Sequence, residues 1–227
     1  MSIAENIALI KAGLPANVGL VAVSKTKPSE LLMEAYQCGQ RIFGENKVQE
    51  LVWKQEELPK HIDWHFIGHL QTNKVKYIAA FVQLIHGVDS FKLLKTIDAE
   101  AKKASRIIPC LIQFHIAEEE TKFGFSLEEA LEMMNSSDFK SLVNVAISGV
   151  MGMATYTDKE TQIRKEFAHL REIFEKLKLE CFAGNADFKE ISMGMSGDYR
   201  IAVEEGSTMV RIGSTIFGER NAKQPTI

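Results

Sequence analysis

One lysine follows directly after a predicted strand, at a place that suits covalent chemistry. The run Gly19–Ser24 is apolar and is predicted to be a buried strand, and Lys25 comes next. Lys25 continues the alternation of Val21 and Val23, so we expect its side chain on their side of the sheet. An amine withdrawn from water is driven toward its neutral form, a nucleophile that can form a Schiff base with a carbonyl. The alternative is a lysine whose amine reaches solvent.

Two turns rich in small residues follow the last two predicted strands and are suited to binding an anion. The first is Ser192–Asp198 (SMGMSGD), in which Ser196 adds a hydroxyl, and the second is Arg211–Thr215 (RIGST), which contains Gly213 and Ser214. Small residues let backbone N–H groups approach an anion. Each turn alone is a common surface feature, but the loops after strands seven and eight are where barrels often hold phosphate.

Arg211 shares its strand face with Met209, two residues before Gly213. Its guanidinium can pair with a carboxylate or donate to a ring nitrogen of a bound cofactor. A lysine for an aldehyde, a site for a phosphate and a donor for an aromatic nitrogen together describe pyridoxal 5′-phosphate.

The elements that must position these residues alternate between short apolar runs and amphipathic segments. Eight runs are predicted as strands: Gly19–Ser24, Arg41–Gly44, Trp64–Gly68, Val82–His86, Pro109–Ile116, Val143–Met151, Lys189–Met193 and Thr208–Gly213. Helices are predicted at 2–12, Ser29–Cys38, Asn46–Leu58, Thr72–Ala80, Phe91–Ser105, Leu127–Asn135, Asp158–Lys178 and Tyr199–Glu205. No structure is predicted for 179–188.

This order predicts an α/β fold, a single (β/α)8 TIM barrel. No Asn-Gly hairpin signal joins neighbouring runs, which favours parallel strands. Eight units in 227 residues suit one closed barrel over residues 1–227, with the extra N-terminal helix covering its bottom. A doubly wound open sheet is the alternative.

Composition excludes several classes of protein. A net charge of −3 gives no basic surface for nucleic acid. No apolar stretch approaches the roughly 20 residues that a membrane-spanning helix needs, and no signal peptide is recognisable, so we expect a cytoplasmic protein without membrane contact. Three widely spaced cysteines offer neither a disulfide framework nor a metal knuckle. We expect no metal site, because His65, His69 and His86 lack metal-ligand spacing and suit hydrogen bonding instead.

Unusual stretches run nearly from end to end of the chain: VAVSKTKP, GQRIFGENKVQE, WHFIGHLQTNK, HGVDS, TKFGFS, GVMGMA and ISMGMSGDYRIAVEEGSTMVRIGSTIFG. Through them the sequence resembles the pyridoxal phosphate homeostasis protein family. That family is similar to the N-terminal barrel of alanine racemases, which agrees with the predicted barrel.

The resemblance implies a role for six residues. Lys25 is implied to form the Schiff base with pyridoxal 5′-phosphate, and Arg211 to be the partner of the pyridine nitrogen. The phosphate cradle is implied to comprise Ser196, Gly213 and Ser214. Asn46, after the second strand, resembles a motif residue that lines the same pocket.

The resemblance implies a monomeric carrier and buffer of the cofactor without strong catalytic activity, which supplies the cofactor to apo-enzymes that depend on it. Related racemases take a second base, a tyrosine, from another domain, and we expect that domain to be missing because the chain ends soon after Ser214. Two alternatives stay open. One is a racemase or lyase with Lys25 as sole base, and the other is a cofactor-free barrel in which Lys25 attacks a sugar carbonyl.

Overall fold

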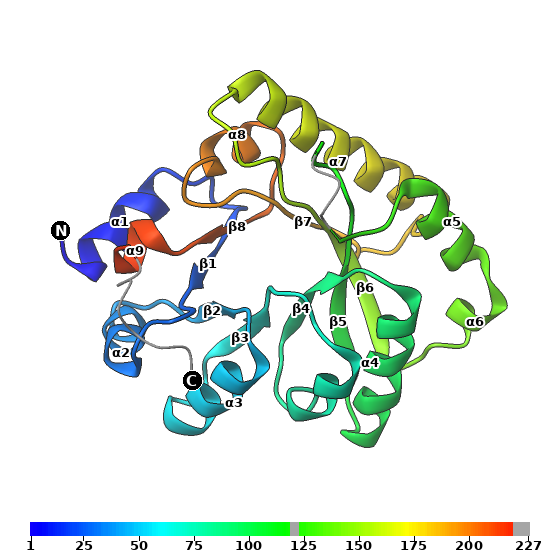
Figure 1. Ribbon diagram of the computed structural model, residues 1–227, viewed down its shortest axis with the longest axis horizontal. Helices are drawn as coiled ribbons and strands as arrows, with labels where there is room; N and C mark the ends of the chain where they lie inside the picture. The colour runs from blue at the N-terminus through cyan, green and yellow to red at the C-terminus, as the bar shows by residue number, and fades with distance from the viewer. Residues whose placement is uncertain (119–122, 220–227) are drawn as a thin grey trace.

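A computed structural model describes residues 1–118 and 123–219, whose strands close into one parallel barrel (Figure 1). Each strand pairs in parallel with the next, and β8 pairs with β1. The strands are β1 (Gly19–Val23), β2 (Ile42–Glu45), β3 (Asp63–Phe66), β4 (Leu84–Val88), β5 (Ile108–Gln113), β6 (Val145–Met151), β7 (Glu190–Ser192) and β8 (Met209–Ile212). The predicted (β/α)8 barrel is confirmed, and the open-sheet alternative is wrong.

Helices surround this barrel on the outside (Figure 1). They are α1 (Ile3–Ala12), α2 (Ser29–Gln37), α3 (Val48–Glu57), the 3-10 helix η1 (Thr72–Tyr77), α4 (Phe91–Lys103), α5 (Leu127–Asn135), α6 (Ser137–Lys140), α7 (Glu160–Glu180), α8 (Tyr199–Glu204) and α9 (Ser214–Phe217). The sequence did not predict α6 or α9, because a single turn is too short to show a helical period.

The alternation along each strand decides which side chains enter the barrel. Five apolar side chains from five strands form the inner cluster: Val21, Leu84, Leu111, Met151 and Met209. A larger cluster fills the layer between strands and helices. Because side chains alternate along a strand, the residues that continue the parity of Val21 and Met209, namely Lys25 and Arg211, belong to the inner side.

The N-terminal helix α1 is present but does not lie where the sequence predicted. It packs in the outer ring against α2 and α9 rather than across the bottom of the barrel. The amide of Asn6 donates to the carbonyl oxygen of Ile216, 3.1 Å away. The buried Ile3, Ile7 and Ile10 explain this packing, since they form one apolar stripe that needs a neighbouring helix surface.

The segment 179–188 completes α7 and then turns back toward β7. Phe188 is fully buried and stacks on Phe174 and Phe182, with ring centroids 5.0 Å and 4.2 Å apart. The stack fixes a stretch that has no helical or strand period.

Among 1–118 and 123–219, no helix combines the length and the apolar composition required to cross a membrane. In the same part of the chain, no three His, Cys, Asp or Glu side chains gather as metal ligands would. The prediction of one domain over 1–227 extends beyond these residues and stays a prediction.

Candidate functional site

A cavity of about 820 Å³ opens at the carboxyl ends of the strands. Its walls come from the residues that end or follow β1, β2, β3, β5, β6, β7 and β8. All six residues singled out in the sequence line it: Lys25, Asn46, Ser196, Arg211, Gly213 and Ser214. Parallel strands place their carboxyl ends at one rim, so residues up to 189 positions apart in sequence meet there.

The two small-residue turns are in direct contact. The backbone N–H of Gly213 donates to Oγ of Ser196, with a distance of 3.3 Å. A Cβ atom at Gly213 would lie 3.0 Å from the carbonyl oxygen of Val23, so a larger residue would push the turn away from β1. In α9, which begins at Ser214, the N–H groups of Ile216 and Phe217 donate to the carbonyl oxygen of Gly213, whereas those of Ser214 and Thr215 precede the first such bond of the helix. This corner of the cavity therefore offers hydroxyls and backbone donors to an anion.

Arg211 lines the cavity and is itself buried. Its Nη1 donates to Oγ of Ser192 at 2.6 Å, and its Nη2 donates to the carbonyl oxygen of Gly152 at 3.1 Å. Burial lowers the pKa of Arg211 to about 10, and the charge of Asp198 opposes that shift. The guanidinium consequently remains a cation at neutral pH. Its Nη1 and Nη2 are fixed by these hydrogen bonds, and the side chain still lines the cavity.

A chain of buried polar groups supports Arg211 from inside the barrel. Nδ1 of His86 lies 2.8 Å from Oγ of Ser192, and Nε2 of His86 lies 2.9 Å from Nδ1 of His65. Burial lowers the pKa of His65 to about 3 and holds the pKa of His86 well below its usual range, with His65 and Arg211 adding to the effect on His86. Both rings are neutral at pH 7, and the hydrogen-bonding roles predicted for them are confirmed.

These neutral histidines make stability depend on pH. The unfolded chain binds a proton at His65 below about pH 6.5, whereas the folded chain does so only near pH 3, so stability rises with pH across that window. Replacing His65 with Asn should reduce the slope of unfolding free energy between pH 4 and 6 by up to about 1.4 kcal/mol per pH unit. Urea unfolding at several pH values measures this slope. His61→Asn, at an exposed position, is the control, and an unchanged slope in His65→Asn would contradict the assignment.

Asn46 reaches the cavity from the turn between β2 and α3. The turn lies against the end of β3, where a Cβ atom at Gly68 would be 2.6 Å from the carbonyl oxygen of Asn46. The sequence predicted Asn46 as the first residue of a helix, but α3 begins at Val48, and the difference leaves Asn46 in the loop. Gly68 thus permits the close approach that brings Asn46 to the rim.

Comparisons with known proteins agree with this geometry. The family described as alanine racemase, N-terminal domain matches residues 1–221. A relative from Aquifex aeolicus, named pyridoxal phosphate homeostasis protein, is 41% identical over 202 residues, which cover 88% of this chain and 86% of the relative. The chain belongs to the pyridoxal phosphate homeostasis protein family.

Two solved structures share the fold of this chain. PipY of Synechococcus elongatus, solved with pyridoxal phosphate bound, is 34% identical with a TM-score of 0.87, covering 96% of this chain and 100% of PipY. Alanine racemase from Bartonella henselae, with covalently bound pyridoxal phosphate, is 16% identical with a TM-score of 0.71, covering 95% of this chain and 60% of the racemase. The second likeness shows the fold alone.

The cavity rim also contains His69, for which the sequence indicated hydrogen bonding, and three residues that it did not assign to the site, Gln113, Phe123 and Tyr156. Nδ1 of His69 lies 2.6 Å from Oδ2 of Asp89, and its ring stacks on Phe123 with centroids 4.5 Å apart. His69 and Phe123 line the cavity together with Gln113 and Tyr156. The signal for Gln113 was present, because a polar residue ends the otherwise apolar β5. The sequence carries no comparable signal for the exposed Phe123 and Tyr156.

Proposed function

We propose that this chain holds pyridoxal 5′-phosphate in the cavity, anchored reversibly on Lys25, and serves as a carrier and buffer of that cofactor in the cytoplasm. The observation that carries the proposal is the meeting of Lys25, Arg211 and the Ser196–Gly213 corner in one cavity. It is supported by the family membership and by the pyridoxal phosphate bound to PipY.

The donors around the cavity fit the three functional parts of that cofactor. When bound, pyridoxal phosphate supplies an aldehyde, which the Lys25 amine can attack reversibly with loss of water. Ser196, Ser214 and the nearby backbone N–H groups would hold the phosphate. Arg211 would donate to the pyridine nitrogen from a position fixed by Ser192.

Arg211 also supports a carrier rather than a fast enzyme. A guanidinium is a donor that keeps its own proton near neutral pH, so it leaves the ring nitrogen without one. A ring nitrogen without a proton withdraws electrons weakly, which damps the carbanion chemistry for which enzymes use this cofactor. The chain is therefore proposed to act without strong catalysis, as a monomer that releases the cofactor for apo-enzymes that need it.

Borohydride reduction followed by peptide mass analysis tests the binding. Protein incubated with pyridoxal phosphate should carry one pyridoxyl group, on the peptide that contains Lys25. An adduct spread over surface lysines, with none at Lys25, would overturn the proposal. Incubation with single amino-acid enantiomers tests the second part, because sustained change in optical rotation would favour the racemase or lyase alternative. A protein that neither turns yellow nor takes up the cofactor would favour the cofactor-free alternative.

A further inference from the structure

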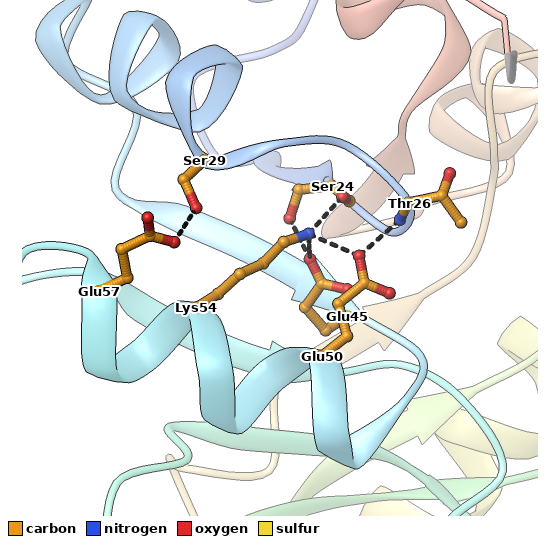
Figure 2. Close-up of polar contacts among 7 residues, drawn as sticks. All are labelled: Ser24, Thr26, Ser29, Glu45, Glu50, Lys54 and Glu57. Atoms are coloured by element: carbon orange, nitrogen blue, oxygen red, sulfur yellow. Dashed lines mark hydrogen bonds and ion pairs between the residues drawn. The ribbon is translucent and has the colours of Figure 1, made fainter. Parts of the chain in front are cut away.

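A buried ion cluster connects helix α3 to the ends of β1 and β2, next to the residue that precedes Lys25. Lys54 on α3 is fully buried, and its Nζ donates to three oxygens: the Ser24 carbonyl oxygen, Oε1 of Glu45 and Oε1 of Glu50, each at 2.7 Å (Figure 2). An ammonium has three donors, so all of them are used. None of these contacts involves the cavity, and the proposed function does not use the cluster.

The two carboxylates of the cluster bind the residues on either side of Lys25. Oγ of Ser24 donates to Oε1 of Glu45 at 2.6 Å, and the backbone N–H of Thr26 donates to Oε1 of Glu50 at 2.6 Å (Figure 2). Thr26 has a φ of +65°, a left-handed conformation that is unfavourable for a β-branched residue. The charge-assisted bond that the Thr26 N–H donates to Glu50 stabilises that conformation, which sets the direction of the chain just after Lys25.

The remaining residues between β1 and α2 make hydrogen bonds to two different parts of the chain. Oγ of Ser29, at the start of α2, donates to Oε2 of Glu57 at the end of α3, 2.5 Å away (Figure 2). On the opposite side, Nζ of Lys27 donates to the carbonyl oxygens of residues 217–219 at 3.1, 2.8 and 2.8 Å. These contacts leave Lys27 half-buried. The backbone around Lys25 therefore has few conformations.

Burying these charged groups costs desolvation free energy, so the cluster contributes little net stability to the fold. The free energy lost when an ammonium and a carboxylate leave water offsets the free energy gained from their attraction. Well-packed apolar side chains at such positions often stabilise a protein equally well. Burial raises the pKa of Glu45 to about 7 despite the nearby Lys54, and Oε2 of Glu45 has no hydrogen-bond partner within the described part of the chain. What the ionic arrangement supplies, and apolar packing would not, is directional bonds to Ser24 and Thr26.

We propose that Lys54, with Glu45 and Glu50, is a positioning group that directs the Lys25 amine into the cavity. It acts through the backbone of Ser24 and Thr26 and touches no ligand. The inference rests on the proposed function, since it assigns the cluster to the lysine that anchors the cofactor.

The test compares two matched variants of Glu50, whose side chain is 17% exposed and tolerates change better than Lys54. Glu50→Gln retains an acceptor for the Thr26 N–H, whereas Glu50→Ala removes it. We expect Glu50→Ala to weaken cofactor affinity about tenfold and Glu50→Gln to restore most of that loss, as followed by absorbance titration. Lys54→Met, which removes all three bonds, should have the larger effect. Lys103→Met, which breaks only an exposed pair with Glu100, should have none.

A second readout needs no cofactor. Trace labelling of the apoprotein with acetic anhydride, followed by peptide mass analysis, gives the reactivity of Lys25 relative to the exposed Lys165. We expect this ratio to change at least threefold in Glu50→Ala and to stay near the wild-type value in Glu50→Gln. Because the ratio is measured without pyridoxal phosphate, it decides the role of the cluster even if wild-type protein forms no adduct at Lys25.

Folded Glu50→Ala with wild-type affinity and wild-type labelling of Lys25 would overturn the inference. Equal losses in Glu50→Gln and Glu50→Ala would overturn it too, because they would point to charge alone rather than to the bond with Thr26. Circular dichroism and thermal unfolding establish that each variant is folded. If Lys54→Met does not fold, the Glu50 pair alone decides.

Discussion

Lys25→Ala is expected to lower the affinity for pyridoxal phosphate by about 100-fold, equivalent to about 2.7 kcal/mol. The substitution removes the only proposed covalent anchor and leaves the phosphate corner at Ser196 and Gly213 intact. Weak binding should persist, because the donors for the phosphate and the ring nitrogen remain. Equilibrium dialysis in a phosphate-free buffer of fixed ionic strength measures the change in affinity.

The control for this loss is Lys47→Ala, since Lys47 is exposed, precedes α3 and lies outside the cavity lining. It should bind the cofactor with unchanged affinity. Lys25 is half-buried, so its replacement should alter the unfolding temperature little. If Lys25→Ala bound the cofactor with an affinity within threefold of wild type, the proposal that the Lys25 amine anchors it would be wrong.

Gly149→Ala is expected to destabilise the fold by at least about 4 kcal/mol, beyond the range of most single substitutions. Gly149 has a φ of +153°, and a Cβ atom there would lie 1.8 Å from the backbone oxygen of Glu190. The neighbouring atoms belong to the backbone of β7, so no side-chain rotation relieves the overlap. The register of β6 against β5 shifts just before this residue, between Ile147 and Gly149, and β7 leads into the turn that carries Ser196.

Gly13→Ala is the matched control. A Cβ atom at Gly13 would make ordinary contacts at 3.6 and 3.7 Å, and the residue has a φ of −90°. Its unfolding free energy should change by less than about 1 kcal/mol. Urea unfolding followed by circular dichroism compares the two variants. A Gly149→Ala protein as stable as Gly13→Ala would show that β6 and β7 do not approach each other as described.

Local patterns were enough to predict the barrel and the inward direction of Lys25. A strand alternates with a period of two residues, so the parity of Val21 fixes that of Lys25 without any knowledge of neighbouring strands. The order of strands and helices also predicts that the last two turns share a rim, because parallel strands end on the same side. For this reason, Ser196 and Gly213 could be placed together from sequence.

Helix α1 shows where such patterns stop being sufficient. Its stripe of Ile3, Ile7 and Ile10 required an apolar neighbour, but the stripe does not say which surface provides it. The structure selects α2 and α9, and α9 itself is a single turn with no sequence period.

The sequence alone thus determined the fold, the strand that leads into Lys25 and the two turns rich in small residues. Only the tertiary structure decided what supports them. Lys54 belongs to an amphipathic helix, where a lysine usually faces water, yet it is buried beneath Ser24. The contact of Arg211 with Ser192 likewise depends on how neighbouring strands are staggered. Burial and stagger arise from the packing of distant segments, and no local period encodes either of them.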